Sequence, residues 1–257
     1  MLPRDFYDRE VTQVARDLLG KYFVRVSDDG PTAGRIVEVE AYLGRDDPAS
    51  HAFRGQTRRN ATMFGPPGYA YVYAIHSRWC VNVTTEPEGT PSAVLIRAVE
   101  PLVGLPLMHR RRCARKARSE PERKRGATTG LSAGRYGRVG RERQRALAAP
   151  AAPLSPAQLR DLARGPARLC EAFAIDRTLD AWDLTRRETL WITATPPDRV
   201  PLLSEQCSDA GGAATSAVRH TPPHIVTTPR IGVTSAHDLP LRFFFADNPF
   251  VSKPRVR

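Results

Sequence analysis

Two glutamates and a tyrosine occupy alternate positions in one short stretch of this chain. The stretch runs from Gly34 to Gly44 and is rich in β-branched residues, which predicts a β-strand. The side chains of a strand point alternately to its two faces. A carboxylate beside an aromatic ring, both held by a rigid strand, could act as a general base next to a bound planar group. One face carries Ile36, Glu38, Glu40 and Tyr42, and the other carries Val37, Val39, Ala41 and Leu43.

Two interpretations of the acidic face are open from this pattern. Charged residues are mostly exposed, so the strand could lie at an edge of the sheet with its glutamates in solvent. The alternative is a pocket in which one carboxylate and the ring of Tyr42 lie together. Arg97 favours the pocket, because it interrupts an apolar strand predicted for residues 92–99 and a buried arginine needs an acidic partner.

The rest of the chain supplies elements that could position these residues. A helix is predicted for residues 8–20, with Asp8 as its N-cap. A polar loop over 44–68 follows the acidic strand directly, and loops of this length are usually functional or disordered. Further predicted elements are a strand at 22–26, a β-hairpin of strands 69–75 and 80–84 joined by 76–79, helices opening at 155–156 and 165–166, strands within 189–199 and 241–245, and a loop over 204–224.

The composition favours a nucleic-acid-binding protein. The 257 residues fit one large domain or two small ones, and the net charge is +12. A charge of this size predicts a polyanionic partner, with nucleic acid first and an anionic membrane surface second. The sequence has no apolar run that could span a bilayer, and its N-terminus lacks the apolar core of a signal peptide, so we expect a soluble intracellular protein. The four cysteines form no C-x-x-C pair, which indicates neither a zinc site nor a disulfide framework.

A basic segment divides the chain. Between about residues 107 and 153 arginines are dense and no core-forming periodicity is visible. We therefore expect an insertion that forms a loop or a partly disordered arm. It could be a solvated spacer or could contact DNA phosphates, and the two interpretations are compatible.

Short segments spread along the chain also carry a likeness to a known family. These segments are Leu2–Tyr7, Arg35–Gly44, Ser50-His51, Arg58–Asn60, Met63-Phe64, Pro67–Tyr73, Val81–Val83, Val94–Pro101, Gly165–Cys170, Ala174-Ile175, Pro229–Val233, Pro240–Phe243 and Asn248–Ser252. Taken in order, they resemble the alkyladenine (3-methyladenine) DNA glycosylase family. Each segment alone is a weak signal, whereas the ordered set is specific, and the basic segment between them does not match.

The resemblance implies a fold and an activity. The fold is mixed α/β (α+β): a single domain over residues 1–257 with a curved, mostly antiparallel sheet, surrounding helices and a protruding DNA-intercalating β-hairpin. The activity is that of a base excision repair enzyme, which flips an alkylated or deaminated purine out of double-stranded DNA and hydrolyses its N-glycosidic bond. No cofactor and no metal are implied. We expect a monomer that does not bind membranes and lies in the cytoplasm, or with the nucleoid in a bacterium.

The resemblance also assigns catalytic roles. Glu40 is implied to be the general base that activates the attacking water, with Arg97 as its charged partner. Glu38 shares the predicted face and could support Glu40 from outside the pocket, but we assign it no catalytic role and keep the interpretation of an ordinary solvated residue. No lysine lies near these motifs, and a Schiff-base lyase needs an amine nucleophile, so hydrolysis by water alone is expected.

Binding roles follow from the same resemblance. The residues implied to contact the flipped base are Tyr42, His51, Tyr73 and Asn82. The aromatic rings would stack on it, and the asparagine would penalise the exocyclic amine of normal guanine. At the hairpin tip the family usually has a tyrosine that enters the DNA. Here His76 takes that position, and the role falls to His76 or to Arg78.

Two functions of other classes stay open. The chain could be a catalytically idle DNA-binding protein on the same fold, against which Glu40 and Arg97 argue. It could also hydrolyse free nucleosides or nucleotides, against which the net charge of +12 and the hairpin argue.

Overall fold

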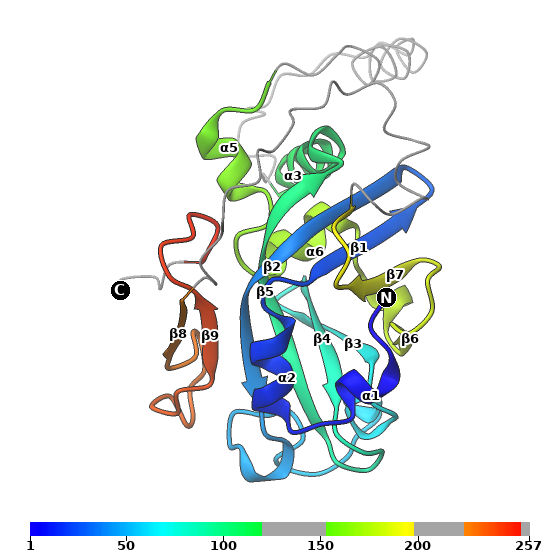
Figure 1. Ribbon diagram of the computed structural model, residues 1–257, viewed down its shortest axis with the longest axis vertical. Coiled ribbons are helices and arrows are strands. Elements are labelled where there is room, and N and C mark those ends of the chain that lie inside the picture. The colour runs from blue at the N-terminus through cyan, green and yellow to red at the C-terminus, as the bar shows by residue number, and fades with distance from the viewer. Residues whose placement is uncertain (120–152, 198–223, 253–257) are drawn as a thin grey trace, which may run out of the picture.

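A nine-stranded sheet carries the architecture of the protein in the computed structural model, which describes residues 1–119, 153–197 and 224–252 (Figure 1). The strand order is β6-β3-β4-β5-β2-β1-β7, and β9 pairs with both β2 and β8. Every pairing described is antiparallel, as predicted for a single α+β domain. The strands are β1 Tyr22–Ser27, β2 Gly30–Tyr42, β3 Tyr69–Ile75, β4 Arg78–Thr85, β5 Ser92–Val103, β6 Trp182–Asp183, β7 Leu190–Thr193, β8 Ile225–Thr228 and β9 Arg242–Phe245.

The acidic strand β2 lies in the middle of this sheet. It pairs with β5 on one side, and on the other its first part pairs with β1 and its last part with β9. Glu38 and Glu40 are therefore bordered on both sides, and neither has any exposed surface. The interpretation of β2 as a solvent-facing edge strand is wrong.

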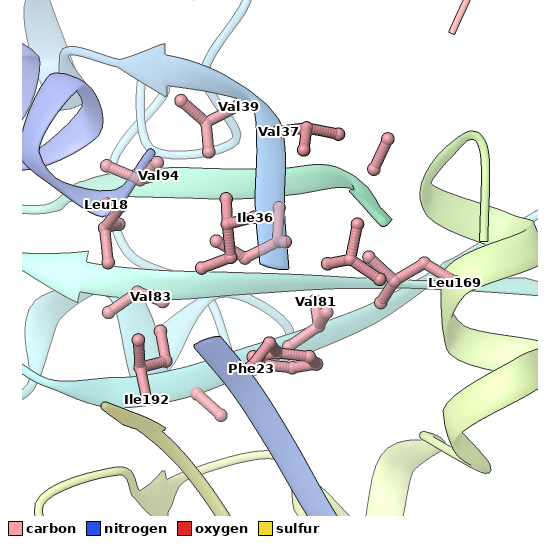
Figure 2. Packing of buried hydrophobic residues seen from close by; sticks show 14 of the residues in the cluster. Leu18, Phe23, Ile36, Val37, Val39, Val81, Val83, Val94, Leu169 and Ile192 are labelled. Atoms are coloured by element: carbon pink, nitrogen blue, oxygen red, sulfur yellow. The ribbon is translucent and has the colours of Figure 1, made fainter. Parts of the chain in front are cut away.

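Alternate residues of the central strands build two separate cores. Val72 of β3 and Val81 of β4 belong to the main core, which the apolar stripes of helices α2 (Val11–Leu18) and α6 (Pro166–Phe173) cover (Figure 2). Tyr71 and Tyr73 alternate with these valines and belong to a second cluster. Because side chains alternate along a strand, the second cluster lies on the opposite face, under the loop over 44–68.

Two irregularities in the β2–β5 ladder change the simple alternation. Ile36 lies opposite Val99 and Glu38 opposite Ala98, so β2 contributes an extra residue between them. As a result Ile36 lies in the main core, and its predicted place on the face of the glutamates is wrong. The next residue of β2 lies opposite Ile96, so Arg97 is the extra residue on β5. Bulges of this kind redirect side chains and are common beside active sites.

The helices differ in part from their predictions. Helix α2 is capped by Glu10, whose carboxylate accepts hydrogen bonds from two backbone N–H groups, and not by Asp8. The helices that open at Pro156 and Pro166 begin where predicted. The helices are α1 Arg4–Tyr7, α2 Val11–Leu18, α3 Leu105–Ser119, α5 Pro156–Asp161 and α6 Pro166–Phe173, and the short 3-10 turns are Gly44–Asp46, Ala61–Phe64 and Arg177–Leu179.

The basic segment begins as a helix. Helix α3 buries Met108 against the main core, so the expectation of a loop or disordered arm from residue 107 is wrong as far as Ser119. The remainder, residues 120–152, lies outside the described residues, as does nearly all of the loop predicted for 204–224. None of the helices in the described ranges has the length and hydrophobicity needed to cross a membrane.

The end of β2 is shaped by Gly44. Its φ of +75° is a conformation that L side chains rarely adopt, and a Cβ added there would lie 2.7 Å from the carbonyl oxygen of Pro91. Gly55, in the same long loop, also has a positive φ, of +92°, but a Cβ there would meet nothing within 4 Å. Gly44 therefore carries a steric constraint in addition to the conformational one.

We expect Gly44→Ala to destabilise the fold more than Gly55→Ala. Both substitutions force alanine into left-handed backbone, which costs about 1–2 kcal/mol. Gly44→Ala adds a clash with fixed backbone, worth roughly 1–3 kcal/mol more. Free energies of unfolding from urea titrations measure the difference, and equal values for the two variants would contradict the clash at Pro91.

Candidate active site

Arg97 joins the two glutamates of β2 in a buried ion cluster. Its Nε lies 3.0 Å from Oε1 of Glu38, and its Nη1 lies 3.0 Å from Oε2 of Glu40. Burial by itself lowers the pKa of Arg97, but the carboxylates of Glu40 and Glu38 outweigh burial and raise that pKa above its ordinary value. The guanidinium is thus permanently charged and compensates both acids.

Glu38 is saturated with hydrogen-bond donors. Its Oε1 accepts from Arg97, from Nε of Arg242 at 2.7 Å and from Oγ of Ser252 at 2.7 Å. Its Oε2 accepts from the backbone N–H of Ser252 at 2.6 Å. These four donors, three at Oε1 and one at Oε2, equal in number the roughly four acceptor positions of an ionised carboxylate. The interpretation of Glu38 as a solvated residue is wrong, because it is the buried centre that ties β2, β5, β9 and Ser252 together.

Glu40 keeps one acceptor position. Its Oε1 accepts the backbone N–H of Ile231 at 2.7 Å, and its Oε2 accepts from Arg97 and from the Tyr42 hydroxyl at 3.1 Å. These three donors leave about one of its four acceptor positions available. Burial and the charge of Glu40 raise the pKa of Tyr42, so the phenol stays protonated and donates to the carboxylate.

A second buried ion pair fixes the ring of Tyr42. Arg230 and Asp47 form two parallel contacts, of which Nη2–Oδ1 measures 2.8 Å. The guanidinium of Arg230 lies over the Tyr42 ring, 4.6 Å from its centroid, and also donates to the carbonyl of Ala41 at 3.0 Å. Asp47 in turn accepts the backbone N–H of Leu43. The segment after β2 is thereby locked around the tyrosine.

A pocket of about 310 Å³ opens next to this cluster. Tyr42 lines it, and so do Gly232 and Thr234. The last two residues follow Ile231, whose backbone N–H donates to Glu40. Further lining residues are His51, Tyr71, Tyr73, Ile75 and Asn82. The volume is at the small end of the range of about 300–1,000 Å³ for ligand sites, which suits one planar ring system.

Three aromatic rings form the wall contributed by β3 and the preceding loop. The ring centroids of Tyr71 and Tyr73 are 5.2 Å apart with 33° between the planes, and those of His51 and Tyr73 are 4.4 Å apart at 73°. Nδ1 of His51 lies 2.8 Å from the Tyr71 hydroxyl. Tyr71 was not among the predicted residues, although its spacing of two from Tyr73 in one strand indicates a shared face.

Asn82 lies on β4 directly opposite Tyr71. Its Nδ2 donates to the backbone carbonyl of Tyr71 at 3.1 Å, across the hairpin, and the side chain lines the pocket. No side chain or backbone group in the described ranges donates to its Oδ1. The amide is therefore fixed by the hairpin and presents a defined edge to the pocket.

The hairpin turns over two residues, fewer than the predicted four. His76 and Ser77 form the turn with φ of 46° and 61°, whereas Arg78 already belongs to β4. His76 is exposed at the tip, and beside it Ile75, 44% exposed, reaches the pocket rim. Arg78 bonds Glu171 of α6 at 3.1 Å, so its guanidinium is directed along the hairpin toward that helix.

Comparisons with known proteins fit this geometry. Residues 5–249 match the family model described as methylpurine-DNA glycosylase. The chain is 37% identical to a protein of Koribacter versatilis over 99% of this chain and 94% of that protein, and 38% identical to one of Methanoculleus marisnigri over 98% of both. A protein of Carboxydothermus hydrogenoformans is 36% identical over 98% of this chain and 99% of its own length. All three bear the provisional name 3-methyladenine DNA glycosylase.

The chain belongs to the methylpurine-DNA glycosylase family. DNA glycosylases are hydrolases of N-glycosyl bonds, and that is the enzyme class of this chain. Within the described ranges, no three His, Cys, Asp or Glu side chains are grouped so that they could hold a metal ion.

Residues that sequence reasoning missed come mainly from the C-terminal part of this family member. Arg230, Arg242 and Ser252 each lie in a segment that carried the family resemblance, but no role was attached to them. Their acidic partners, Glu38 and Asp47, lie far away in sequence. The sequence did carry a signal for these residues, because each is a polar side chain within a short apolar segment. As for Arg97, such a position indicates a buried polar partner.

Removal of the Glu38 charge should destabilise this family member strongly. Glu38→Gln leaves Arg97 and Arg242 incompletely compensated in the interior, and breaking a buried pair costs about 3–5 kcal/mol. Asp17→Asn, at the exposed Arg9–Asp17 pair, is the control and should cost less than about 1 kcal/mol. Urea unfolding measures both, and a cost for Glu38→Gln as small as that of the control would refute its structural role.

His51 should titrate below its ordinary pKa of about 6.5. Partial desolvation of the ring against Tyr71 and Tyr73, and then the charge of Arg59, lower the pKa of His51. The unfolded chain therefore takes up this proton at a higher pH than the folded chain does, and the contribution of His51 to stability falls as the pH drops below about 6.5. At neutral pH the ring is uncharged and does not repel a cationic ligand.

We expect Arg59→Met to raise the pKa of His51 toward the ordinary value, because it removes the nearby positive charge. NMR titration of the imidazole C–H signals measures this shift. Arg58→Met is the matched control, since the exposed Arg58 is not a cause of the lowered pKa. An equal effect of both substitutions would show that the general basicity of the loop, and not Arg59, sets the pKa.

Proposed function

We propose that this protein is a monofunctional DNA glycosylase that excises damaged purines, both alkylated and deaminated, from double-stranded DNA. One observation carries the proposal most directly. Glu40 is buried beside an aromatic pocket with about one acceptor position free, and it is bonded to Tyr42, which lines that pocket. A carboxylate in that position can hold and deprotonate a water molecule next to a base in the pocket.

The reaction uses water as the nucleophile. As the N-glycosidic bond breaks, its electron pair leaves with the purine and positive charge develops at C1′ of the sugar. The oxygen of water attacks C1′, and Glu40 takes the proton that water loses. The products are the free base and an abasic site. Arg97 orients Glu40 and balances the negative charge beside it, because one guanidinium spans both carboxylates.

Recognition of the base relies on the aromatic wall. Tyr42, His51 and Tyr73 offer π faces to a purine, and an alkylated purine that carries positive charge is also attracted by cation–π interaction. The uncharged state of His51 at neutral pH supports this role. Asn82, fixed through its bond to the carbonyl of Tyr71, would oppose the extra amine of normal guanine.

Extrusion of the base from the helix is assigned to the hairpin. His76 stands at the exposed turn with the apolar Ile75 beside it, and side chains of these kinds can fill the gap left by a flipped nucleotide. Arg78 is less suited to this role, because its guanidinium is engaged by Glu171. Among the residues that the structure describes, those lining the pocket include no lysine, the amine that a Schiff-base mechanism would need.

Glu40→Gln should slow excision strongly. Because it also weakens the buried pair with Arg97, urea unfolding first establishes that the variant is folded under the assay conditions. The test incubates wild type and variant with duplexes that each contain 3-methyladenine, 7-methylguanine, hypoxanthine or ethenoadenine, and then cleaves abasic sites with alkali. Loss of the general base should slow release of the purine by at least about 10²–10⁴-fold on each lesion that the wild type excises. The proposal is wrong if the wild type is inactive on all four lesions, or if the variant releases the purines as fast as the wild type.

Glu100→Gln is the matched control for this assay. Glu100 pairs with Arg35 across the same two strands, β2 and β5, but its side chain is partly exposed and lies outside the pocket. It should leave the rate unchanged. The same assay on free nucleotides separates the proposal from a nucleoside hydrolase, which would act on them as fast as on duplex and without dependence on salt.

A further inference from the structure

Glu171 of α6 forms an ionic hub with three arginines next to the hairpin turn. Its carboxylate bonds Arg78 of β4 at 3.1 Å, contacts Arg112 of α3 directly and lies 3.8 Å from Nε of Arg115 of α3. The Glu171 side chain is only 13% exposed, so the group lies in the interface between the hairpin and the two helices. None of these residues lines the base pocket.

The hub reaches the turn itself through Arg115. Nη2 of Arg115 donates to the backbone carbonyl of Ser77 at 2.7 Å. His76 and Ser77 both have positive φ, as the two central residues of a tight β-hairpin do, and serine adopts this conformation at a cost. The turn is thus held in an unfavourable backbone conformation, with Arg78 bonded on its β4 side and the Ser77 carbonyl bonded at its tip.

We propose that Glu171 is a positioning residue that keeps the hairpin turn rigid for insertion into DNA. Its carboxylate orients Arg115 toward the Ser77 carbonyl and ties Arg78 to α6, so that Ile75 and His76 project from a fixed base. The inference rests on the proposed function, because insertion has a purpose only if a nucleotide is extruded. Glu171 itself touches neither pocket nor reacting atoms.

Charge and positioning predict opposite effects of a substitution at Glu171. Glu171→Gln removes a negative charge from a basic surface, so on electrostatic grounds DNA binding should be unchanged or tighter. A loosened turn should nevertheless slow excision, on the order of ten- to hundredfold in single-turnover rate on a well-paired lesion, as small misplacements do. Tighter binding together with slower excision separates the two effects.

The second readout is how the excision rate depends on whether the lesion is stably paired. Extrusion is easiest for a base that is already mispaired or unstacked. The defect of Glu171→Gln should therefore be much smaller on hypoxanthine in a mispaired or single-stranded context than on hypoxanthine in a stable pair. A defect of equal size on both substrates would overturn the inference, because it would indicate a general loss of active structure.

Asp161→Asn is the control variant. Asp161 of α5 also pairs with arginines, Arg164 and Arg168, but it makes no contact with the hairpin. The substitution removes the same charge and should leave the excision rate unchanged. Arg115→Gln breaks the bond to Ser77 from the other side and should reproduce the Glu171→Gln pattern. It also serves as the test if Glu171→Gln melts far below wild type.

Hydrogen exchange gives a readout that does not need catalysis. In Glu171→Gln, the amides of residues 76–78 should exchange faster than in wild type and in Asp161→Asn. If wild type excises no purine, the proposed function fails, while exchange still decides whether Glu171 holds the turn. If wild type excises purines and Glu171→Gln matches it in rate and in exchange, the inference fails and the proposed function stands.

Discussion

The contact of one arginine with two neighbouring carboxylates is the constraint on which the site depends. Glu38 and Glu40 lie two residues apart on a strand with no exposed surface, and such burial is tolerated only when the charges are paired and hydrogen-bonded. Arg97 reaches both because the bulge on β5 makes it the extra residue opposite them. The C-terminal part of the chain completes the compensation through Arg242, which pairs with Glu38 from β9. The ion cluster is therefore complete only when the C-terminal part of the chain is packed against β2.

The two glutamates have the same chemistry but different numbers of donors. Four donors fill Glu38, whereas three reach Glu40, and one of these is the hydroxyl of a pocket residue, Tyr42. The difference arises from position along β2. Glu38 accepts the backbone N–H of Ser252, whereas Glu40 accepts the backbone N–H of Ile231 beside the pocket. Local backbone geometry thus gives two glutamates of one strand different hydrogen-bond environments, although their residue type is the same.

Apolar alternation predicted the strands β3 and β4, and prolines at helix starts such as Pro166 predicted helix openings. The assignment of Tyr73 and Asn82 to one pocket came from the family resemblance and not from strand alternation, which by itself favours ordinary packing. The bulges were not predictable, because they arise from pairing between strands, and they moved Ile36 into the core. The burial of Glu38 was missed for a related reason, since its partner Arg242 lies about two hundred residues away in the chain. Helix α3 was hidden because its many arginines obscure the apolar positions that dock it.

The distribution of charge explains how a protein of net charge +12 can hold an acidic site. At the site, three carboxylates (Glu38, Glu40 and Asp47) meet three guanidiniums (Arg97, Arg230 and Arg242), so the cluster is neutral as a whole. The surplus of arginine lies elsewhere, and at the hairpin three arginines share one glutamate. A polyanion is therefore attracted to the outside of the protein, where long-range fields act. The pocket wall, in contrast, is mostly aromatic, and the Glu40 carboxylate lies behind Tyr42 without lining the pocket, so short-range contacts and not net charge shape its interior.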